Sequence, residues 1–155
     1  MLRYGLVVAL LIVVLDQATK LAILGAFTTG EVRPVLPFFN LVLVWNRGVS
    51  FGMFDSDGNL VRWLLTGFAL LVVVGLAVWL RRADSRAVAT ALGLVIGGAL
   101  GNVIDRIRFG AVVDFLDIHV ASWHWPAFNV ADGAICIGAA LLVLDSLFAP
   151  RSQTT

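Results

Sequence analysis

Four long apolar segments, separated by polar connections, dominate the pattern of the chain. They run over about residues 2–24, 63–80, 87–107 and 129–148. A helix needs about 20 predominantly apolar residues to cross the hydrocarbon core of a bilayer, and each segment is close to that length. The pattern therefore predicts a membrane protein of the all-α class with four transmembrane helices.

The first apolar segment also has a feature of cleavable signal peptides, because Arg3 precedes an apolar run. Such a peptide ends in a small-x-small cleavage site, and no such site closes this run cleanly. Asp16 and Lys20 also interrupt its apolar part, which is unusual for a disposable signal. We therefore expect the segment to be retained as a helix.

The connections between the segments differ in length. Residues 28–62 and 108–128 form two long connections, whereas residues 81–86 (RRADSR) form a tight turn between the second and third segments. Residues 38–45 are rich in β-branched and aromatic side chains and follow two prolines, which predicts a strand.

Glycines recur every fourth residue on the third segment, at Gly93, Gly97 and Gly101. Small residues at this spacing form a ridge that a neighbouring helix backbone can approach closely. We interpret the ridge as a helix-packing surface.

The composition agrees with a membrane location. Hydrophobic residues make up 60% of the 155-residue chain and charged residues 14%, whereas soluble domains are about 25% charged. The net charge of +1 gives no indication of a nucleic-acid partner. Cys136 is the single cysteine, which excludes an internal disulfide.

Basic residues predict the orientation in the membrane, because short cytoplasmic loops are enriched in lysine and arginine. Three arginines crowd the turn at residues 81–86, whereas the basic residues of the other side are spread over the long connections. We therefore predict that both termini and this turn are cytoplasmic. The two long connections then face outward, and Trp63, Trp123 and Trp125 lie near the outer interface.

Polar side chains converge near this outer interface. Ionisable groups inside a membrane are costly, so each needs a partner or a task. Asp16 and Lys20 are four residues apart on one helix face, where they can form an ion pair, and Asn129 and Asp132 also share a face. The group at this depth comprises Asp16, Lys20, Asn102, Asp105, Arg106, Asp114, Asn129 and Asp132. Their convergence indicates an active site.

Asp114 and Asp132 are the strongest catalytic candidates. Asp114 lies within an apolar run (VVDFL), and Asp132 lies at the start of the fourth segment. Two carboxylates that share a poorly solvated site do not both ionise, so one keeps its proton. The pair then provides a base and an acid. The alternative, that each aspartate caps a helix or pairs with an arginine, suits a single residue better than this many polar groups.

Five segments resemble the conserved boxes of lipoprotein signal peptidase, also called signal peptidase II. They are DQATK at 16–20, NRGVSFG at 46–52, GGALGNVIDR at 97–106, VVDF at 112–115 and FNVAD at 128–132. They occur in this order, and the resemblance covers about residues 1–148.

The resemblance implies an aspartic endopeptidase of the bacterial inner membrane, with four transmembrane helices and a small extracytoplasmic β-sheet. The enzyme would remove the signal peptide of prolipoproteins just before a cysteine that bears diacylglyceryl. Its partners would be these prolipoproteins and membrane lipids, with no nucleic acid, metal or cofactor. We expect residues 1–155 to form a single peptidase domain and a monomer, with the active site near the outer face.

The same resemblance assigns roles to individual residues. It implies that Asp114 and Asp132 form the catalytic dyad, whereas Asp105 supports the structure. The positions that it implies as supporting or substrate-binding are Asp16, Lys20, Asn46, Gly48, Asn102, Arg106, Asn129 and Ala131. Lys20 with Asp16 would shape the entrance or bind lipid head groups. One departure is visible, because Val49 and Ser50 stand where the family usually has two small residues such as alanines.

Two other protease classes can be weighed on the same residues. Residues 48–52 (GVSFG) match G-x-S-x-G, so a membrane serine protease with Ser50 as nucleophile and a histidine base is an alternative. That motif requires a strand-to-helix turn, and the residues that follow Ser50 do not favour an opening helix. A metalloprotease would need a motif such as H-E-x-x-H. His119 and His124 lack its glutamate, and we interpret them as interfacial histidines of a wet loop.

A small proton- or ion-coupled transporter is the remaining alternative, with Asp16, Lys20 and Asp132 along the path. A path requires polar side chains at several depths. The inner half of the predicted bundle is nearly all apolar, which disfavours transport.

Overall fold

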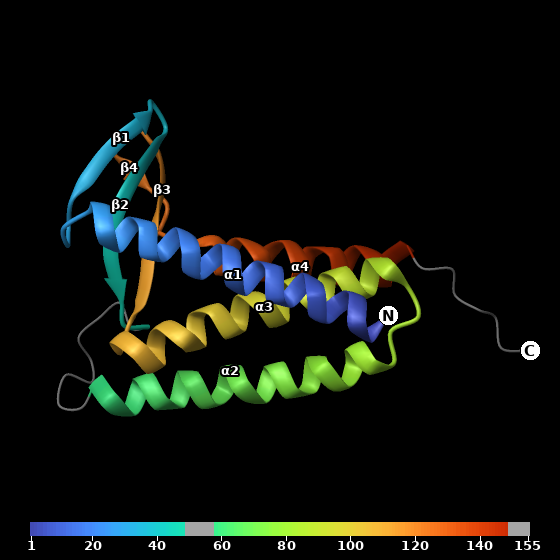
Figure 1. Ribbon diagram of the computed structural model, residues 1–155. Coiled ribbons are helices and arrows are strands. Elements are labelled where there is room, and N and C mark those ends of the chain that lie inside the picture. The colour runs from blue at the N-terminus through green and yellow to red at the C-terminus, as the bar shows by residue number, and fades with distance from the viewer. Residues whose placement is uncertain (49–57, 149–155) are drawn as a thin grey trace, which may run out of the picture.

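A bundle of four long helices carries a small sheet at one end (Figure 1). The computed structural model describes residues 1–48 and 58–148. Its elements are α1 (Leu2–Ala26), β1 (Val32–Leu36), β2 (Phe39–Asn46), α2 (Gly58–Arg81), α3 (Arg86–Phe109), β3 (Val112–Val120), β4 (Trp123–His124) and α4 (Val130–Phe148).

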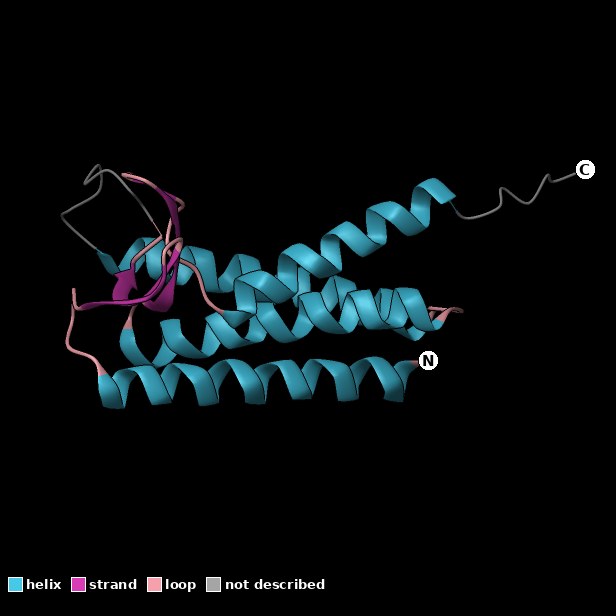
Figure 2. Cartoon of the chain, turned by 90° about the horizontal axis from the view of Figure 1, so that it is seen from above, coloured by secondary structure: helices cyan, strands magenta, loops and turns pink. Residues whose placement is uncertain are grey.

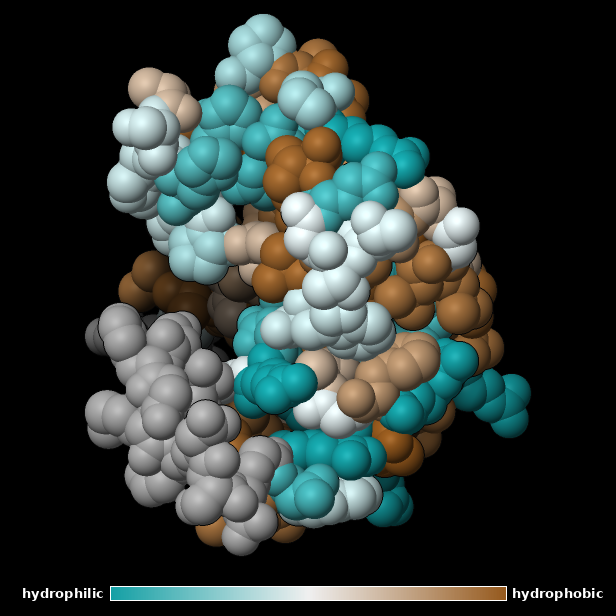
Figure 3. Space-filling model, turned by 90° about the vertical axis from the view of Figure 1, so that its left-hand side faces the viewer, coloured by the Kyte–Doolittle hydropathy of each residue, from teal (hydrophilic) through white to brown (hydrophobic). Residues whose placement is uncertain are grey.

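All four helices are long and apolar enough to cross a membrane, as predicted. Their outward faces carry large apolar side chains that are mostly exposed. Leu10 is 62% exposed on α1, Leu71 is 73% exposed on α2 and Leu147 is 69% exposed on α4. Exposed apolar surface on this scale suits lipid and not water. The end that bears the sheet differs, because hydrophilic side chains gather across it (Figure 3).

The turn between α2 and α3 lies where the sequence predicts it. Ser85 is the N-cap of α3, and its side chain accepts a hydrogen bond from the Val88 backbone N–H at 3.1 Å. Gly110 ends the helix with φ +79°, a left-handed conformation that glycine adopts without strain. α2 begins at Gly58, five residues before the predicted start, because the backbone hydrogen bonds of a helix continue into a polar first turn.

α3 is the central helix and the most buried of the four. A Cβ added to Gly93 would lie 2.6 Å from the carbonyl oxygen of Gly5, and one added to Gly97 would lie 2.6 Å from that of Ala9. The glycine ridge thus packs directly against the backbone of α1, as the four-residue spacing predicts. Gly98, on another face, is packed as closely against Ala131 of α4.

The sheet is antiparallel, with strand order β1-β2-β3-β4. It lies across one end of the bundle in both ribbon views (Figure 1, Figure 2). Ile23 of α1 packs in a small core with Leu43, Val113 and Phe115 of the sheet. In the register of β2 and β3, Val44 lies opposite Asp114.

The predicted strand at residues 38–45 corresponds to β2, whereas β3 was expected only as a connection. Charged and histidine side chains interrupt the apolar alternation of residues 112–120. The segment becomes a strand because β2, about 70 residues earlier, offers it a backbone ladder.

We predict that the close approach of α1 and α3 limits position 97 to glycine. Gly97→Ala should lower the midpoint of thermal unfolding in detergent, because its Cβ would lie 2.6 Å from the Ala9 oxygen. Forcing a methyl group into a packed interface typically costs about 1–3 kcal/mol. Gly75→Ala on α2 is the matched control. Nothing lies within 4 Å of its added Cβ, so it should keep or raise the midpoint. Equal midpoints for both variants would contradict the packing.

Candidate active site

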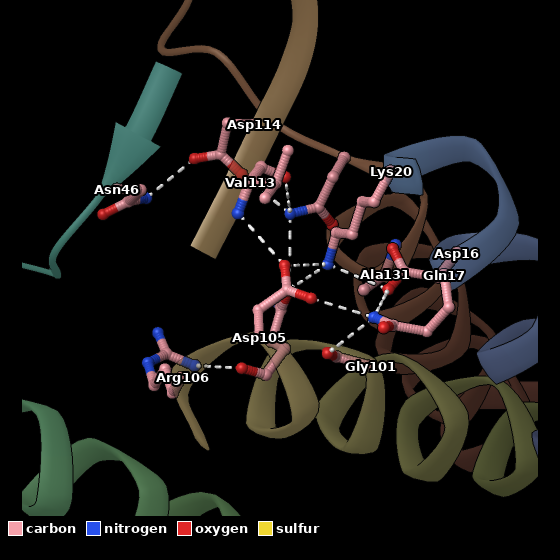
Figure 4. Close-up of polar contacts among 12 residues, drawn as sticks. Asp16, Gln17, Lys20, Asn46, Gly101, Asp105, Arg106, Val113, Asp114 and Ala131 are labelled. Carbon is pink, nitrogen blue, oxygen red and sulfur yellow. Dashed lines mark hydrogen bonds and ion pairs between the residues drawn. The ribbon is translucent and has the colours of Figure 1, made fainter. Parts of the chain in front are cut away.

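The predicted catalytic aspartates meet where the sheet joins the helix ends. Asp114 lies on β3 and is 1% exposed, and Asp132 lies in the first turn of α4 and is half-buried. Figure 4 shows Asp114 above the end of α3, with Asn46 of β2 on one side and Lys20 of α1 on the other. Three helices and two strands therefore contribute to one polar cluster.

The buried side chain of Asn129 joins the two carboxyl-bearing residues. Its Nδ2 donates to Asp114 Oδ1 at 2.7 Å, and its Oδ1 accepts from the Asp132 backbone N–H at 3.0 Å. The Asn129 backbone N–H also donates to Asp132 Oδ2 at 3.2 Å. The sequence predicts Asn129 and Asp132 on one helix face, whereas in the structure Asn129 precedes α4 and its side chain caps the first turn of that helix. Asp114 of β3 joins them through the same side chain.

Two further amides complete the contacts of the carboxylates. Asn46 Nδ2 donates to Asp114 Oδ2 at 2.9 Å, and Asn102 Nδ2 donates to Asp132 Oδ1 at 2.8 Å. Each of the four carboxylate oxygens thus accepts one N–H. Such a site can hold a negative charge, yet it offers no cation in direct contact with either carboxylate among the described residues.

Burial raises the pKa of Asp114 to about 6, and the nearby charge of Asp132 adds to the rise. Hydrogen bonds from Asn46 and Asn129, and the positive charge of Lys20, lower this pKa and offset part of the effect. A carboxyl group with such a pKa exchanges its proton close to neutral pH, which suits acid–base chemistry.

Lys20 lies behind the carboxylates, not at an entrance. Its Nζ lies 2.8 Å from Asp16 Oδ2, 2.9 Å from Asp105 Oδ2 and 3.1 Å from Asn102 Oδ1, and its side chain is 2% exposed. The predicted ion pair with Asp16 is therefore confirmed. The expectation that Lys20 shapes the entrance or binds lipid head groups is wrong, because three protein oxygens enclose its ammonium group.

The carboxylates around Lys20 tie the elements together (Figure 4). Asp105 Oδ2 accepts from the Val113 backbone N–H at 3.0 Å, next to Asp114 on β3. Asp16 Oδ1 accepts from the Ala131 backbone N–H at 2.9 Å, next to Asp132 on α4. Each carboxylate thus anchors the backbone beside one member of the pair.

The structure also places the other supporting candidates. Gly48, with φ +86°, donates its N–H to Asn46 Oδ1 at 2.8 Å. Arg106 is half-buried and donates from Nη1 to the Asn102 carbonyl oxygen at 3.4 Å. Gln17 was not predicted, although it lies in the DQATK box. Its Nε2 donates to Asp105 Oδ1 at 2.9 Å and to the Gly101 carbonyl oxygen at 3.2 Å.

The two histidines lie in strands and make no hydrogen bond to the aspartate pair. The prediction that they lie in a wet loop is therefore wrong. His124 of β4 lies 2.9 Å from Asp117 Oδ1 and stacks on His119 of β3. Burial favours a higher pKa for Asp117, but hydrogen bonds from Asn40 and His124 outweigh it and lower that pKa. Within residues 1–48 and 58–148, no group of three or more histidine, cysteine, aspartate or glutamate side chains is arranged for a metal. Ser50, with its neighbour Val49, lies outside the described residues.

Known proteins match this chain over nearly its whole length. The family described as signal peptidase (SPase) II matches residues 8–148. The lipoprotein signal peptidase of Methylorubrum extorquens is 51% identical over 99% of this chain and 91% of its own length. That of Cupriavidus necator is 53% identical over 90% of this chain and 80% of its own length.

Solved structures agree with the fold. A bacterial membrane enzyme that is 29% identical superposes with a TM-score of 0.82, covering 94% of this chain and 93% of that one. A second bacterial membrane enzyme, also 29% identical, gives a TM-score of 0.79 with 92% and 87% covered. These similarities support neither the serine protease nor the transporter. The chain is a multi-pass membrane peptidase and belongs to the signal peptidase II family.

Proposed function

We propose that this peptidase is of the aspartic type, with Asp114 and Asp132 as its catalytic pair. The observation that carries the proposal is the bridge formed by Asn129, whose side chain contacts the Asp114 carboxylate and the Asp132 backbone. Two carboxyl groups beside one buried amide, one of them with its pKa raised to about 6, are suited to share a proton.

The substrates that fit this site are the prolipoproteins of the family, cleaved just before the diacylglyceryl-modified cysteine. Their signal helix would enter sideways from the lipid, with the acyl chains remaining in the bilayer. The polar cluster contacts β3 at the sheet end of the apolar bundle. We expect the peptide bond beside the lipid anchor to reach this end.

The chemistry follows from one proton shared between two carboxyl groups. The ionised aspartate takes a proton from water, and the water oxygen adds to the carbonyl carbon before the modified cysteine. The protonated aspartate donates a hydrogen bond to the carbonyl oxygen as the tetrahedral intermediate forms. The C–N bond then breaks, and a proton passes to the leaving amine. The amides of Asn46, Asn102 and Asn129 orient the two carboxyl groups, and Arg106 lies beside them.

We further propose a single domain over residues 1–155, acting as a monomer in the bacterial inner membrane. Both termini would be cytoplasmic and the active site would lie near the outer face. Trp63, Trp123 and Trp125 are 53–61% exposed and Trp79, at the other end of α2, is 48% exposed, which suits a membrane interface at each end of the bundle. The orientation itself rests on the arginines. The arginine-rich turn between α2 and α3 lies at the end opposite the sheet.

The catalytic pair predicts the behaviour of two variants. Asp114→Asn and Asp132→Asn should each lower kcat by about three orders of magnitude or more while leaving KM within a few-fold, since each removes the acid or the base. The double variant should cost little more than either single one. The measurement is cleavage of a diacylglyceryl-modified prolipoprotein by the purified protein, beside its unlipidated precursor. Near-normal turnover in either single variant would refute the aspartic assignment.

The raised pKa of Asp114 predicts how stability depends on pH. The folded protein binds this proton more tightly than the unfolded chain, so the cost of the buried charge is present above pH 6 and disappears as pH falls through 6 towards 4. Between pH 8 and pH 5, the thermal midpoint of the wild type should therefore rise relative to that of Asp114→Asn. Asp84→Asn, in the exposed turn, is the control and should follow the wild type. Parallel curves for wild type and Asp114→Asn would contradict the shift.

The orientation can be tested with single cysteines in a Cys136→Ser background. Cysteine at position 122 should react with a membrane-impermeant thiol reagent applied from outside intact spheroplasts, whereas cysteine at position 85 should react only after lysis. Labelling at 85 but not at 122 would place the catalytic pair on the cytoplasmic side and overturn the orientation.

A further inference from the structure

Three asparagines surround the catalytic pair, and each directs its side-chain NH2 group at a carboxylate oxygen. Asn46 and Asn129 donate to Asp114, and Asn102 donates to Asp132. An asparagine amide can turn by 180° and exchange its NH2 group for its oxygen. An oxygen facing a carboxylate would repel it, so the site requires each amide to be held in one orientation.

The orientation of each amide is fixed by a group that can donate but not accept a hydrogen bond and that contacts the amide oxygen. For Asn46 this group is the backbone N–H of Gly48 at 2.8 Å, and for Asn129 it is the backbone N–H of Asp132 at 3.0 Å. Both are local contacts within two or three residues. Neither requires a further element of the fold.

Asn102 differs, because the donor that contacts its amide oxygen is a side chain from a different helix. Lys20 Nζ donates to Asn102 Oδ1 at 3.1 Å, across 82 residues of sequence. An ammonium group has three hydrogens and accepts none. Its other two hydrogens are directed to Asp16 and Asp105, so the lysine cannot turn away without losing an ion pair. The Asn102 oxygen also accepts a longer hydrogen bond from Asn129 Nδ2 at 3.3 Å.

We propose that Lys20 is a positioning residue that acts on the catalytic pair through Asn102, making Asp132 the ionised base and leaving Asp114 to carry the shared proton. This inference rests on the proposed function and assigns the two roles within it. By binding the Asn102 oxygen, Lys20 commits the NH2 group to Asp132 at 2.8 Å.

The surroundings of the two carboxyl groups favour this division. Asp132 lies in the first turn of α4, where the helix dipole stabilises an anion, and it also accepts the Asn129 backbone N–H. Asp114 is the more buried of the two and is the third residue of β3, and a strand has no such dipole. Within residues 1–48 and 58–148, the other charged groups that act on the pair are Lys20 from α1 and Arg106 from α3. Asp16 and Asp105 lie behind them, in contact with Lys20.

The experiment compares Lys20→Met, Asn102→Leu and the double variant in the purified full chain, using the pH dependence of kcat on the lipidated substrate. The acidic limb of the kcat profile is the pH range in which kcat falls as the pH is lowered. Each single variant should move this limb to higher pH by about one to two units, which is the effect of losing one hydrogen bond to a charged group. At a pH below this limb, kcat should be lower than that of the wild type by about tenfold or more, and KM should stay within a few-fold. The double variant should shift the acidic limb no further than Asn102→Leu, because the lysine reaches Asp132 through the amide. The direct charge of Lys20 acts on Asp114, so any additional shift should appear in the alkaline limb.

Two variants guard the interpretation. Arg108→Gln neutralises an exposed cation at the same end of α3 and should leave the limb unchanged. If Lys20→Met does not fold, Lys20→Met is combined with Asp105→Asn, which gives the buried cluster the same net charge as in the wild type. The limb of this double variant is then compared with that of Asp105→Asn alone.

Additive shifts of the acidic limb in the double variant, a shift in Arg108→Gln, or an unchanged limb in Asn102→Leu would each overturn the positioning role. A shift confined to the alkaline limb would overturn the assignment of base and acid. The proposed function fails separately, if Asp114→Asn or Asp132→Asn retains turnover.

Discussion

The active end of this protein depends on one buried ion cluster, in which the Lys20 ammonium lies between Asp16 and Asp105. Removing three charges from water is costly, and the cost is offset only when every hydrogen and lone pair finds a partner. Here Asp105 Oδ2 also accepts the Val113 backbone N–H, and Asp16 Oδ1 accepts that of Ala131. Asp105 Oδ1 accepts Gln17 Nε2. The cluster therefore fixes β3 and α4 relative to α1 and α3, which brings the two catalytic candidates together.

Close helix packing makes this cluster possible. A Cβ on Gly101 would lie 2.5 Å from Asp16 Oδ2, and a Cβ on Gly97 would lie 2.6 Å from the carbonyl oxygen of Ala9. The glycine ridge of α3 thus allows the α1 backbone, and with it the carboxylate of Asp16, to reach the centre of the bundle. Lipid offers little hydrophobic drive for helices to associate, so contact between backbones and buried polar bonds must supply it.

A peptidase in a membrane has to keep water and charge at one depth while the rest of its surface stays apolar. The bundle meets this requirement by placing its polar groups where α1, α3 and α4 meet the sheet, beside the apolar core of Ile23, Leu43, Val113 and Phe115. Asp114 is buried at this junction, and its burial raises its pKa to about 6. The same packing that orders the site therefore tunes its acidity, which links the stability of the fold to the chemistry that we propose.

The sequence by itself determined the four spans, the turn before α3, the glycine ridge and the Asp16–Lys20 pair, because length, hydropathy and helical spacing are local properties. Its ordered boxes also indicated the family and the two aspartates. Only the tertiary structure decided that residues 112–120 form a strand, that the Lys20 ammonium is enclosed and not exposed to head groups, and that Gln17 joins the network. Those features depend on partners about 70 to 90 residues away, and which oxygen an amide or ammonium meets is set by that packing and not by spacing along the chain.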